Sequence, residues 1–263
     1  MVTGDVCDQG LLERILGEYE IETVFHLAAQ AIVKTCSNDP YSTFDINVMG
    51  TANILEACRN CGENVKSVVV SASDKAFGNA PVPYTEESPL NPLYIYDTSK
   101  ACQSLLSLCY FHNFDVPTKV VASSNIYGPG DYNISRIIPN TLTRLLTGQK
   151  AQLNSKVKDF VREFVYIDDA VNAFITTSRK GKNGELYCCG GTSHLKICDL
   201  IEKMCDLTGR DFSTSVESFN KPVQFKEIKE QYIDSSKLKS LGWEPKTSLE
   251  EGLKKCVDFY SEL

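Results

Sequence analysis

The chain has 263 residues, enough to bury a substantial core as one large domain or two smaller ones. Its formal net charge of -7 gives no electrostatic footprint for nucleic acid or for an anionic membrane. No stretch approaches the ~20 continuous apolar residues of a transmembrane helix, and residues 1–10 lack the apolar region of a signal peptide. We therefore expect a cytoplasmic protein with no nucleic-acid or membrane partner.

The sequence contains eleven cysteines, an odd number at irregular spacing. Cys58 and Cys61 form the only C-x-x-C pair, with no second pair at zinc spacing and only three histidines in the chain. We expect free, mostly buried thiols and no metal site.

The first third of the chain predicts alternating strands and helices. Residues 2–6 resemble the end of a strand, residues 11–20 a helix, and residues 21–29 another strand. Because this series opens in the middle of a β-α-β pattern, we expect that preceding strands of the fold are missing. Asp39-Pro40 is a good helix start, with aspartate as cap and proline at the first helical position, and the helix should run to about Arg59.

The segment 71–100 carries the residues suited to chemistry. Residues 66–71 are short, β-branched and largely apolar, as expected for a buried central strand of a parallel sheet. Ser73, Asp74 and Lys75 would leave its carboxyl end, where open α/β sheets bind ligands. Residues 97–113 predict a helix, with Tyr96 at its start and Lys100 one turn later. An ammonium beside a phenol favours the ionised phenol, which is then a general base toward a sugar or alcohol hydroxyl.

The remaining elements continue the alternation to about residue 190. We predict strands at 117–122, 162–168 and 186–189, and helices at 137–148, 169–178, 197–208 and 249–260. The turn Gly128-Pro129-Gly130 ends one sheet layer and lets backbone approach a ligand. The pattern predicts an α/β fold with a doubly wound, Rossmann-type parallel sheet and a smaller C-terminal lobe.

Eight motifs in this order resemble the extended short-chain dehydrogenase/reductases that modify nucleotide sugars, the NAD-dependent epimerase/dehydratase family. They are Gly4-Asp5-Val6, His26-Leu-Ala-Ala29, Asn47-Val-Met-Gly-Thr51, Ser73-Asp-Lys75, Tyr96-Asp-Thr-Ser-Lys100, Asn125-Ile-Tyr-Gly-Pro-Gly130, Arg162-Glu-Phe-Val-Tyr-Ile-Asp-Asp169 and Leu241-Gly-Trp-Glu-Pro245. The resemblance implies NAD as cofactor and a homodimer. It also implies an NAD-binding domain at residues 1–130 and 163–190, and a nucleotide-sugar lobe at 131–162 and 191–263.

Within that family the pair Asp74-Lys75 is informative. Sugar 4,6-dehydratases carry such a pair, whereas 4-epimerases usually have small residues there. Together with residues 227–234, it looks most like the CDP-glucose 4,6-dehydratases. The resemblance implies that Tyr96 takes the 4-hydroxyl proton while hydride moves to NAD⁺. Lys75 then removes the C5 proton, Asp74 protonates the departing 6-hydroxyl, and hydride returns to C6.

The resemblance also implies roles for the binding residues. For the cofactor, Asp5 and Val6 would touch adenine and Lys100 would hold the ribose. The cofactor would also be lined by Leu27, Ala28, Ala29 and Asn47. For the substrate, Ser73 would bind the sugar, and Asn125 and Arg162 would hold the diphosphate. Arg162 is a fork-shaped cation suited to phosphate.

The sequence departs from the family in one major respect, because the Gly-x-x-Gly-x-x-Gly loop is absent. It belongs to a first βαβ unit that would precede Met1. We expect a fragment or misplaced start of a longer dehydratase. Two alternatives are a partner that supplies the missing unit, and a catalytically silent member that acts only through binding or dimerisation. A 4-epimerase is the alternative activity.

Overall fold

The computed structural model describes residues 1–222 and 228–263. The chain divides into two compact units. Unit 1 comprises Met1–Ser123, Val171–Cys189 and Asp234–Trp243, and unit 2 comprises Ser124–Ala170, Gly190–Ile233 and Glu244–Leu263. The division expected from the sequence had boundaries near 130, 162 and 190. In the structure the strand that begins at Val161 lies wholly in unit 2, and residues 234–243 join unit 1.

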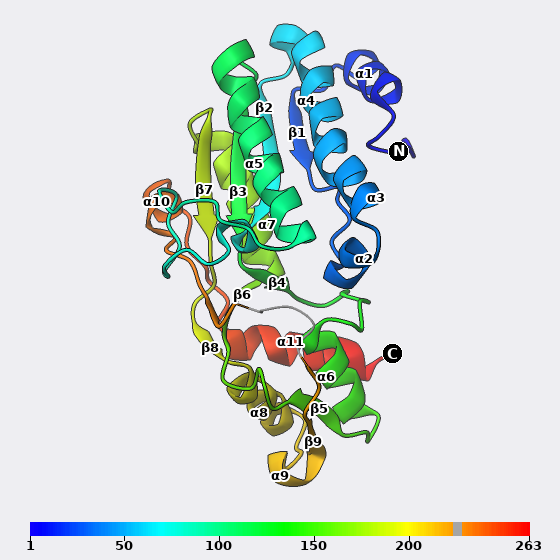
Figure 1. Cartoon of the computed structure of the whole chain (residues 1–263), viewed down its shortest axis with the longest axis vertical. Helices are drawn as coiled ribbons and strands as arrows, with labels where there is room; N and C mark the ends of the chain where they lie inside the picture. Colours follow the sequence, from blue (N-terminus) through cyan, green and yellow to red (C-terminus); the bar gives the residue numbers. More distant parts are fainter. Residues whose placement is uncertain (223–227) are drawn as a thin grey trace. The chain divides into compact units, whose positions relative to one another are not determined.

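Unit 1 is built on a four-stranded parallel sheet with the order β1-β2-β3-β7. Its strands are β1 (Thr23–His26), β2 (Ser67–Ser73), β3 (Thr118–Ser123) and β7 (Glu185–Cys189). Its main helices are α1 (Gln9–Glu18), α4 (Gly50–Asn60), α5 (Ile95–Phe114) and α7 (Ile167–Lys180), the last of which begins in unit 2. Figure 1 shows α4 and α5 along one face of this sheet and α7 behind it. The predicted doubly wound α/β architecture is confirmed.

The central strands of unit 1 are buried because both their faces are covered by helices. Every residue of β3 is buried, and Val68, Val69 and Val70 of β2 are fully inaccessible. A continuous apolar run is the expected sequence of such a strand, so the prediction for this strand is confirmed. The strand β1 lies at the edge of the sheet, where Phe25 is 41% exposed.

The predicted helix 39–59 is divided into three parts. Asp39 accepts a hydrogen bond from the Ser42 backbone N–H at 3.0 Å, and α3 (Pro40–Phe44) begins with proline as expected. A π-helical turn, η1 (Asp45–Met49), then precedes α4. The wider turn adds a residue per turn and so redirects side chains, an irregularity that often marks functional sites.

Several predicted boundaries change. Residues 2–6 form no strand, because their backbone pairs with no neighbouring strand in the described structure, and that prediction was wrong. The helix α5 begins before Tyr96, so this tyrosine lies inside its first turn. The shorter elements of unit 1 were not predicted, since three to six residues show little periodicity: α2 (Val33–Asn38), the 3₁₀ turns η2 (Gly62–Asn64) and η3 (Asp74–Phe77), and α10 (Ser236–Ser240).

The described residues of unit 2 form two small sheets. Strand β6 (Val161–Tyr166) pairs in parallel with β4 (Asn125–Tyr127) and β10 (Glu230–Gln231), and antiparallel with β8 (His194–Lys196). Strands β5 (Ala151–Asn154) and β9 (Val216–Phe219) form a parallel pair. Helices α6 (Ile137–Leu146), α8 (Ile197–Leu207), α9 (Phe212–Ser215) and α11 (Leu249–Ser261) complete the unit. Of the motif at 227–234, Glu227 lies outside the described residues.

The core of unit 2 joins its long helices to β6. Leu142, Leu200 and Leu253 are fully buried, one on each of α6, α8 and α11. Tyr127 packs edge-on against Phe164 and Tyr166. Apolar spacing of three and four residues predicted these helices, and the shared core explains why they form.

Candidate active site

The end of β2 presents a serine, a carboxyl group and an amine in succession. Ser73 ends the strand, and Asp74 and Lys75 open the 3₁₀ turn η3. The Ser73 hydroxyl donates to Asp74 Oδ1 at 3.0 Å and accepts from the Lys75 backbone N–H at 3.3 Å. Ser73 is 9% exposed and Asp74 only 2%, while Lys75 is half-buried. The three residues therefore lie at the carboxyl edge of the sheet, where ligands bind in this class of fold.

The helix α5 brings a buried amine near a phenol. The Lys100 ammonium donates to the Ser71 carbonyl oxygen at 2.9 Å, and its nitrogen lies 6.0 Å from the centroid of the Tyr96 ring. Lys100 is only 4% exposed, and burial lowers its pKa to about 8. At neutral pH most Lys100 amines are therefore still charged, and a positive charge at this distance favours phenolate.

Asn47 connects the π-helical turn to the first turn of α5. Its amide nitrogen donates to the Gln30 carbonyl oxygen at 3.1 Å and to the Ser99 hydroxyl at 2.9 Å. The side-chain oxygen Oδ1 of Asn47 accepts from the Gln30 backbone N–H at 2.6 Å. The Ser99 hydroxyl in turn donates to the backbone carbonyl oxygen of Tyr96 at 2.7 Å. The side chain is fully buried, so these contacts give Asn47 a positioning role beside Tyr96. Its contact with a cofactor stays a prediction.

A buried histidine supports the same region and was given no role by the sequence. His26 Nε2 lies 2.9 Å from the Thr51 hydroxyl, which also accepts from Gln103 at 2.7 Å. Because Thr51 donates its own proton to the backbone carbonyl oxygen of Asn47, we infer that the imidazole donates through Nε2. Burial, and secondarily the charge of Lys100, lowers the pKa of His26 to about 4. The imidazole is therefore neutral. The sequence signal that could have identified this residue is a histidine that ends an apolar strand and precedes Leu-Ala-Ala.

The residues expected to line a cofactor follow β1 or precede α1. Leu27 is 61% exposed, Ala28 is exposed and Ala29 half-buried. Val6 lies against α4, since a Cβ at Gly50 would meet its Cγ1 at 2.6 Å. The exposed Asp5 accepts from the Cys7 backbone N–H at 2.9 Å, which lowers its pKa.

These residues fit part of a dinucleotide. Small and exposed side chains after β1, together with the buried amine of Lys100, suit the nicotinamide and its ribose. The pyrophosphate requires backbone amides at a helix N-terminus, and this sequence has no glycine-rich loop to supply them.

The two residues expected to hold a diphosphate belong to unit 2. Asn125 donates to the Glu163 carbonyl oxygen at 2.9 Å. The Arg162 guanidinium donates to the carbonyl oxygens of Val161 at 2.8 Å and Lys229 at 3.3 Å, and lies 5.7 Å from the Phe160 ring centroid. Their strands β4 and β6 are neighbours in one sheet. The role of these side chains with phosphate stays a prediction.

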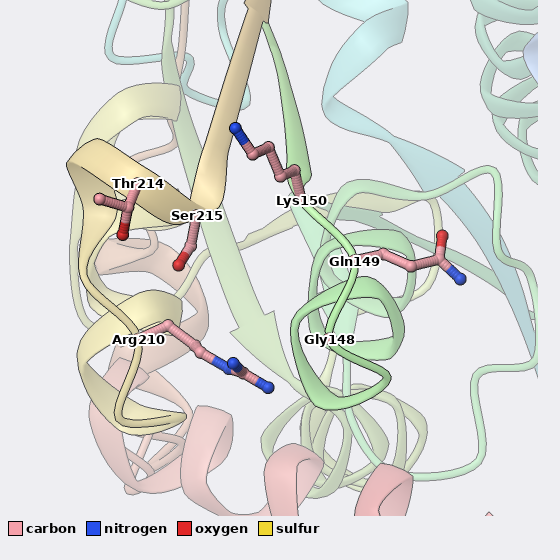
Figure 2. Close-up of a pocket in the computed structure, with 6 residues that line it drawn as sticks. All are labelled: Gly148, Gln149, Lys150, Arg210, Thr214 and Ser215. Carbon is pink, nitrogen blue, oxygen red and sulfur yellow. The ribbon is translucent and has the colours of Figure 1, made fainter.

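Unit 2 also contains a small pocket of about 130 Å³, drawn in Figure 2. It is lined by Gly148, Gln149, Lys150, Arg210, Thr214 and Ser215. None of the residues proposed for catalysis lines it.

Neither a metal site nor a membrane span is found in the described part of the chain. There, no cluster of three or more His, Cys, Asp or Glu side chains is arranged to hold a metal ion. All eleven cysteines are free. Among the same residues, no helix has both the length and the apolar character needed to cross a bilayer.

A parallel sheet that carries a Tyr-x-x-x-Lys pair at its carboxyl edge defines the class of short-chain dehydrogenase/reductase folds. The family model described as GDP-mannose 4,6 dehydratase matches residues 1–256, and the chain belongs to this family. The resemblance stated from the motifs is thereby confirmed.

The relatives carry dehydratase names. Mouse dTDP-D-glucose 4,6-dehydratase is 30% identical over 262 residues, which cover 98% of this chain and 73% of the relative. A trifunctional UDP-glucose 4,6-dehydratase/UDP-4-keto-6-deoxy-D-glucose 3,5-epimerase/UDP-4-keto-L-rhamnose-reductase of Arabidopsis thaliana is 29% identical, and the match covers 99% of this chain. The chain spans 39% of the length of this plant protein.

Solved structures give the same picture. The dTDP-glucose 4,6-dehydratase DesIV of Streptomyces venezuelae, solved with NAD, has a TM-score of 0.91 and 30% identity, covering 99% of this chain and 79% of DesIV. The UDP-glucose 4-epimerase of Thermotoga maritima, solved with UDP-glucose, also has a TM-score of 0.91, with 29% identity and 98% and 83% coverage. The fold is therefore shared by dehydratases and epimerases.

Proposed function

We propose that this chain carries the catalytic residues of an NAD-dependent nucleotide-sugar 4,6-dehydratase. The observation that carries the proposal is the buried carboxyl of Asp74, hydrogen-bonded to Ser73 and followed by Lys75, in the unit that also holds Tyr96 and Lys100. An elimination needs both an acid and a base, and the carboxyl group and the amine at this edge can supply them. A simple redox epimerisation at C4 needs neither group. The relatives named as 4,6-dehydratases support it.

The first step concerns the sugar 4-hydroxyl. Tyr96, as phenolate, accepts its proton, and the charge of Lys100 stabilises the phenolate. Ser73 hydrogen-bonds the same region of the sugar. Bound NAD⁺ would supply the acceptor for the C4 hydride and return that hydride to C6 at the end, while C5 regains a proton from Lys75.

The second step is the elimination of water. A ketone at C4 acidifies the C5–H bond, and the amine of Lys75 removes that proton. Asp74, in its carboxylic acid form, protonates the departing 6-hydroxyl, so that a C5=C6 bond forms and one water leaves. Burial of Asp74 favours the neutral acid that this role requires.

We propose CDP-glucose as the first substrate to test, with dTDP-glucose, UDP-glucose and GDP-mannose beside it. The chain is incubated with NAD⁺ and each sugar, and products are followed by mass spectrometry. Loss of one water from one of these sugars is the expected result, and Asp74→Asn should abolish it.

A C4 epimerase is the second candidate, because the Thermotoga epimerase matches with the same TM-score as DesIV. It would change the stereochemistry at C4 with no change in mass. NMR of the same reactions detects the change in stereochemistry. A folded chain that alters none of the four sugars would contradict both activities and favour a binding or dimerisation role.

We also propose a homodimer formed through α4 and α5. Two apolar side chains of α5, Leu105 and Phe114, are 56% and 53% exposed, which supports the proposal. Light scattering should show a dimer that Leu105→Lys dissociates, while Val171→Lys, at an exposed apolar site on α7, should leave it intact. A monomeric wild type would overturn the proposal.

A further inference from the structure

A buried amide on α5, that of Gln103, has no part in the proposed reaction. Gln103 is fully buried and lies one turn beyond Lys100 on the helix. Its nitrogen Nε2 donates to the Thr51 hydroxyl at 2.7 Å, while its oxygen Oε1 is buried with no hydrogen-bond partner among residues 1–222 and 228–263. An unsatisfied buried acceptor costs stability, a cost that an apolar side chain would avoid. Packing alone therefore does not explain a glutamine at this position.

The Thr51 hydroxyl connects Gln103 to two other elements of unit 1. It donates to the backbone carbonyl oxygen of Asn47 at 2.6 Å, and His26 Nε2 lies 2.9 Å from it. A hydroxyl oxygen accepts up to two hydrogen bonds while it donates one, so Thr51 bonds Asn47, His26 and Gln103 together. A single buried side chain therefore connects the end of β1, the π-helical turn η1 and the helix α5.

A second connection joins the same elements, and each of its residues lies four positions from its counterpart in the first. Asn47 bonds the Gln30 backbone at 2.6 and 3.1 Å and donates to the Ser99 hydroxyl at 2.9 Å. Residues four apart on a helix lie one turn apart on the same face, so Ser99 and Gln103 are both held from one side of α5. The side chains on η1, α4 and α5 are all fully buried. We call the six residues the α5 brace: His26, Gln30, Asn47, Thr51, Ser99 and Gln103.

We propose that Gln103 is a positioning residue that, through Thr51, holds Tyr96 at a fixed distance from the loop after β1. This inference rests on the proposed dehydratase function for its chemical meaning. The loop carries residues 27–29, which are expected to line the cofactor, and α5 carries the phenol. Oxidation at C4 needs the phenol, the sugar and the nicotinamide in line, and a misplacement of about 1 Å can cost roughly 10²-fold in rate. Gln103 would act through this alignment and would touch neither the sugar nor the cofactor.

The decisive measurement needs neither substrate nor cofactor. Hydrogen exchange of the Gln30 backbone amide, followed by NMR, reports whether the loop is held, because this amide donates to Asn47. We expect Gln103→Met to speed exchange of the Gln30 amide by about three- to tenfold relative to the amides of the buried strand β3. A general loss of stability would speed exchange in β3 as well, so the ratio of the two rates isolates the local effect.

Ser104→Ala is the matched control. Ser104 follows Gln103 on α5, is equally buried, and donates to the Lys100 carbonyl oxygen at 3.1 Å within its own helix. Its loss should leave exchange of the Gln30 amide unchanged. Two variants of Thr51 give a second comparison. Thr51→Val keeps the shape without the hydroxyl and should speed exchange at least as much as Gln103→Met, whereas Thr51→Ser keeps the hydroxyl and should stay close to the wild type.

The double variant Thr51→Val with Gln103→Met tests whether both residues act through one contact. If they do, it should exchange no faster at Gln30 than Thr51→Val alone. Effects that multiply, or an unchanged Gln30 amide in folded Gln103→Met, would overturn the proposal. If Gln103→Met does not fold, the wild type provides the test, because the side-chain amide protons of Gln103 should exchange slowly when buried and donated to Thr51. Rapid exchange of these protons would also overturn it.

Turnover distinguishes this inference from the function on which it rests. In the active chain, Gln103→Met should lower kcat by about tenfold and leave KM for the sugar within about twofold, because alignment and not sugar binding is lost. An unchanged kcat overturns the role of Gln103 alone. Absence of turnover with every nucleotide sugar overturns the dehydratase function, and exchange at Gln30 then decides whether Gln103 holds the loop to α5.

Discussion

At the scale of single residues, the site places titratable groups in surroundings that oppose charge. Lys100, Asp97 and His26 are each at most 4% exposed, and burial is the largest cause of the pKa change of each. Perturbed titratable groups of this kind gather at active sites. Because these groups share burial, we expect both the chemistry and the stability of unit 1 to depend on pH.

Lys100→Met tests the cation beside the phenol. Removing the ammonium should raise the pKa of Tyr96 and lower kcat/KM by roughly 10²-fold or more, with the remaining activity displaced to higher pH. Methionine fills most of the volume and needs no hydrogen bond, so circular dichroism should show a folded protein. Lys34→Met, at an exposed site on α2, is the control and should keep full activity. An unchanged pH profile in Lys100→Met would contradict the assigned role.

Asp97 should also make the stability of the protein depend on pH. Its pKa rises from 3.8 to about 6 on folding, so the folded state holds the proton more tightly than the unfolded state. The stabilising contribution of Asp97 to the free energy of unfolding is therefore fully present below about pH 4 and is lost as the pH rises to about 6. The loss amounts to at most about 3 kcal/mol. Asp97→Asn should lack this loss. Urea unfolding of both proteins between these pH values measures the difference, and parallel curves would contradict it.

At the scale of elements, local sequence signals located most helices and strands. The Asp39-Pro40 start, the apolar strand β2 and the helix α5 all follow from residue spacing and capping chemistry, which depend on near neighbours. The π-helical turn η1 did not follow, because its stability comes from bonds of Asn47 to Gln30 and Ser99, residues far away in the chain. Strands of two to four residues in unit 2 were missed for the same reason.

Gly78 is the residue that lets η3 end where it does. Its φ is +55°, and a Cβ there would overlap the carbonyl oxygen of Asn91. We expect Gly78→Ala to lower the free energy of unfolding by about 2–4 kcal/mol and to disturb the neighbouring Asp74 and Lys75. Gly62→Ala is a matched control, because Gly62 has φ +59° but open space around it, and should cost about 1 kcal/mol. Equal losses in urea unfolding would contradict the steric explanation.

At the scale of the whole molecule, the chain contains the residues proposed for catalysis but not the loop that holds a pyrophosphate in this class of fold. Ser73, Asp74, Lys75, Tyr96 and Lys100 all lie in unit 1, whereas this sequence contains no glycine-rich loop. The chain covers 79% of DesIV and 73% of the mouse dehydratase, and it resembles both over almost its whole length.

We therefore expect this chain by itself to bind NAD weakly. Because a ligand stabilises a protein by RT ln(1 + [L]/Kd), NAD at a concentration below Kd should raise the melting temperature by less than about 2 °C. Differential scanning fluorimetry with increasing NAD measures this, and AMP serves as a control for binding by the adenine end alone. A large, saturable increase at micromolar NAD would contradict the expectation and show that other residues hold the pyrophosphate.

The sequence by itself determined the α/β class, the family and the order of the residues that we propose for catalysis. These depend on period, spacing and short motifs, all of which are local along the chain. Only the tertiary structure decided that Asp97 is buried beside the turn carrying Asp74 and Lys75, that Asn47 ties Gln30 to Ser99, and that residues 234–243 join unit 1. Burial and long-range hydrogen bonds depend on which distant segments meet, and the spacing of residues along one chain does not contain that information.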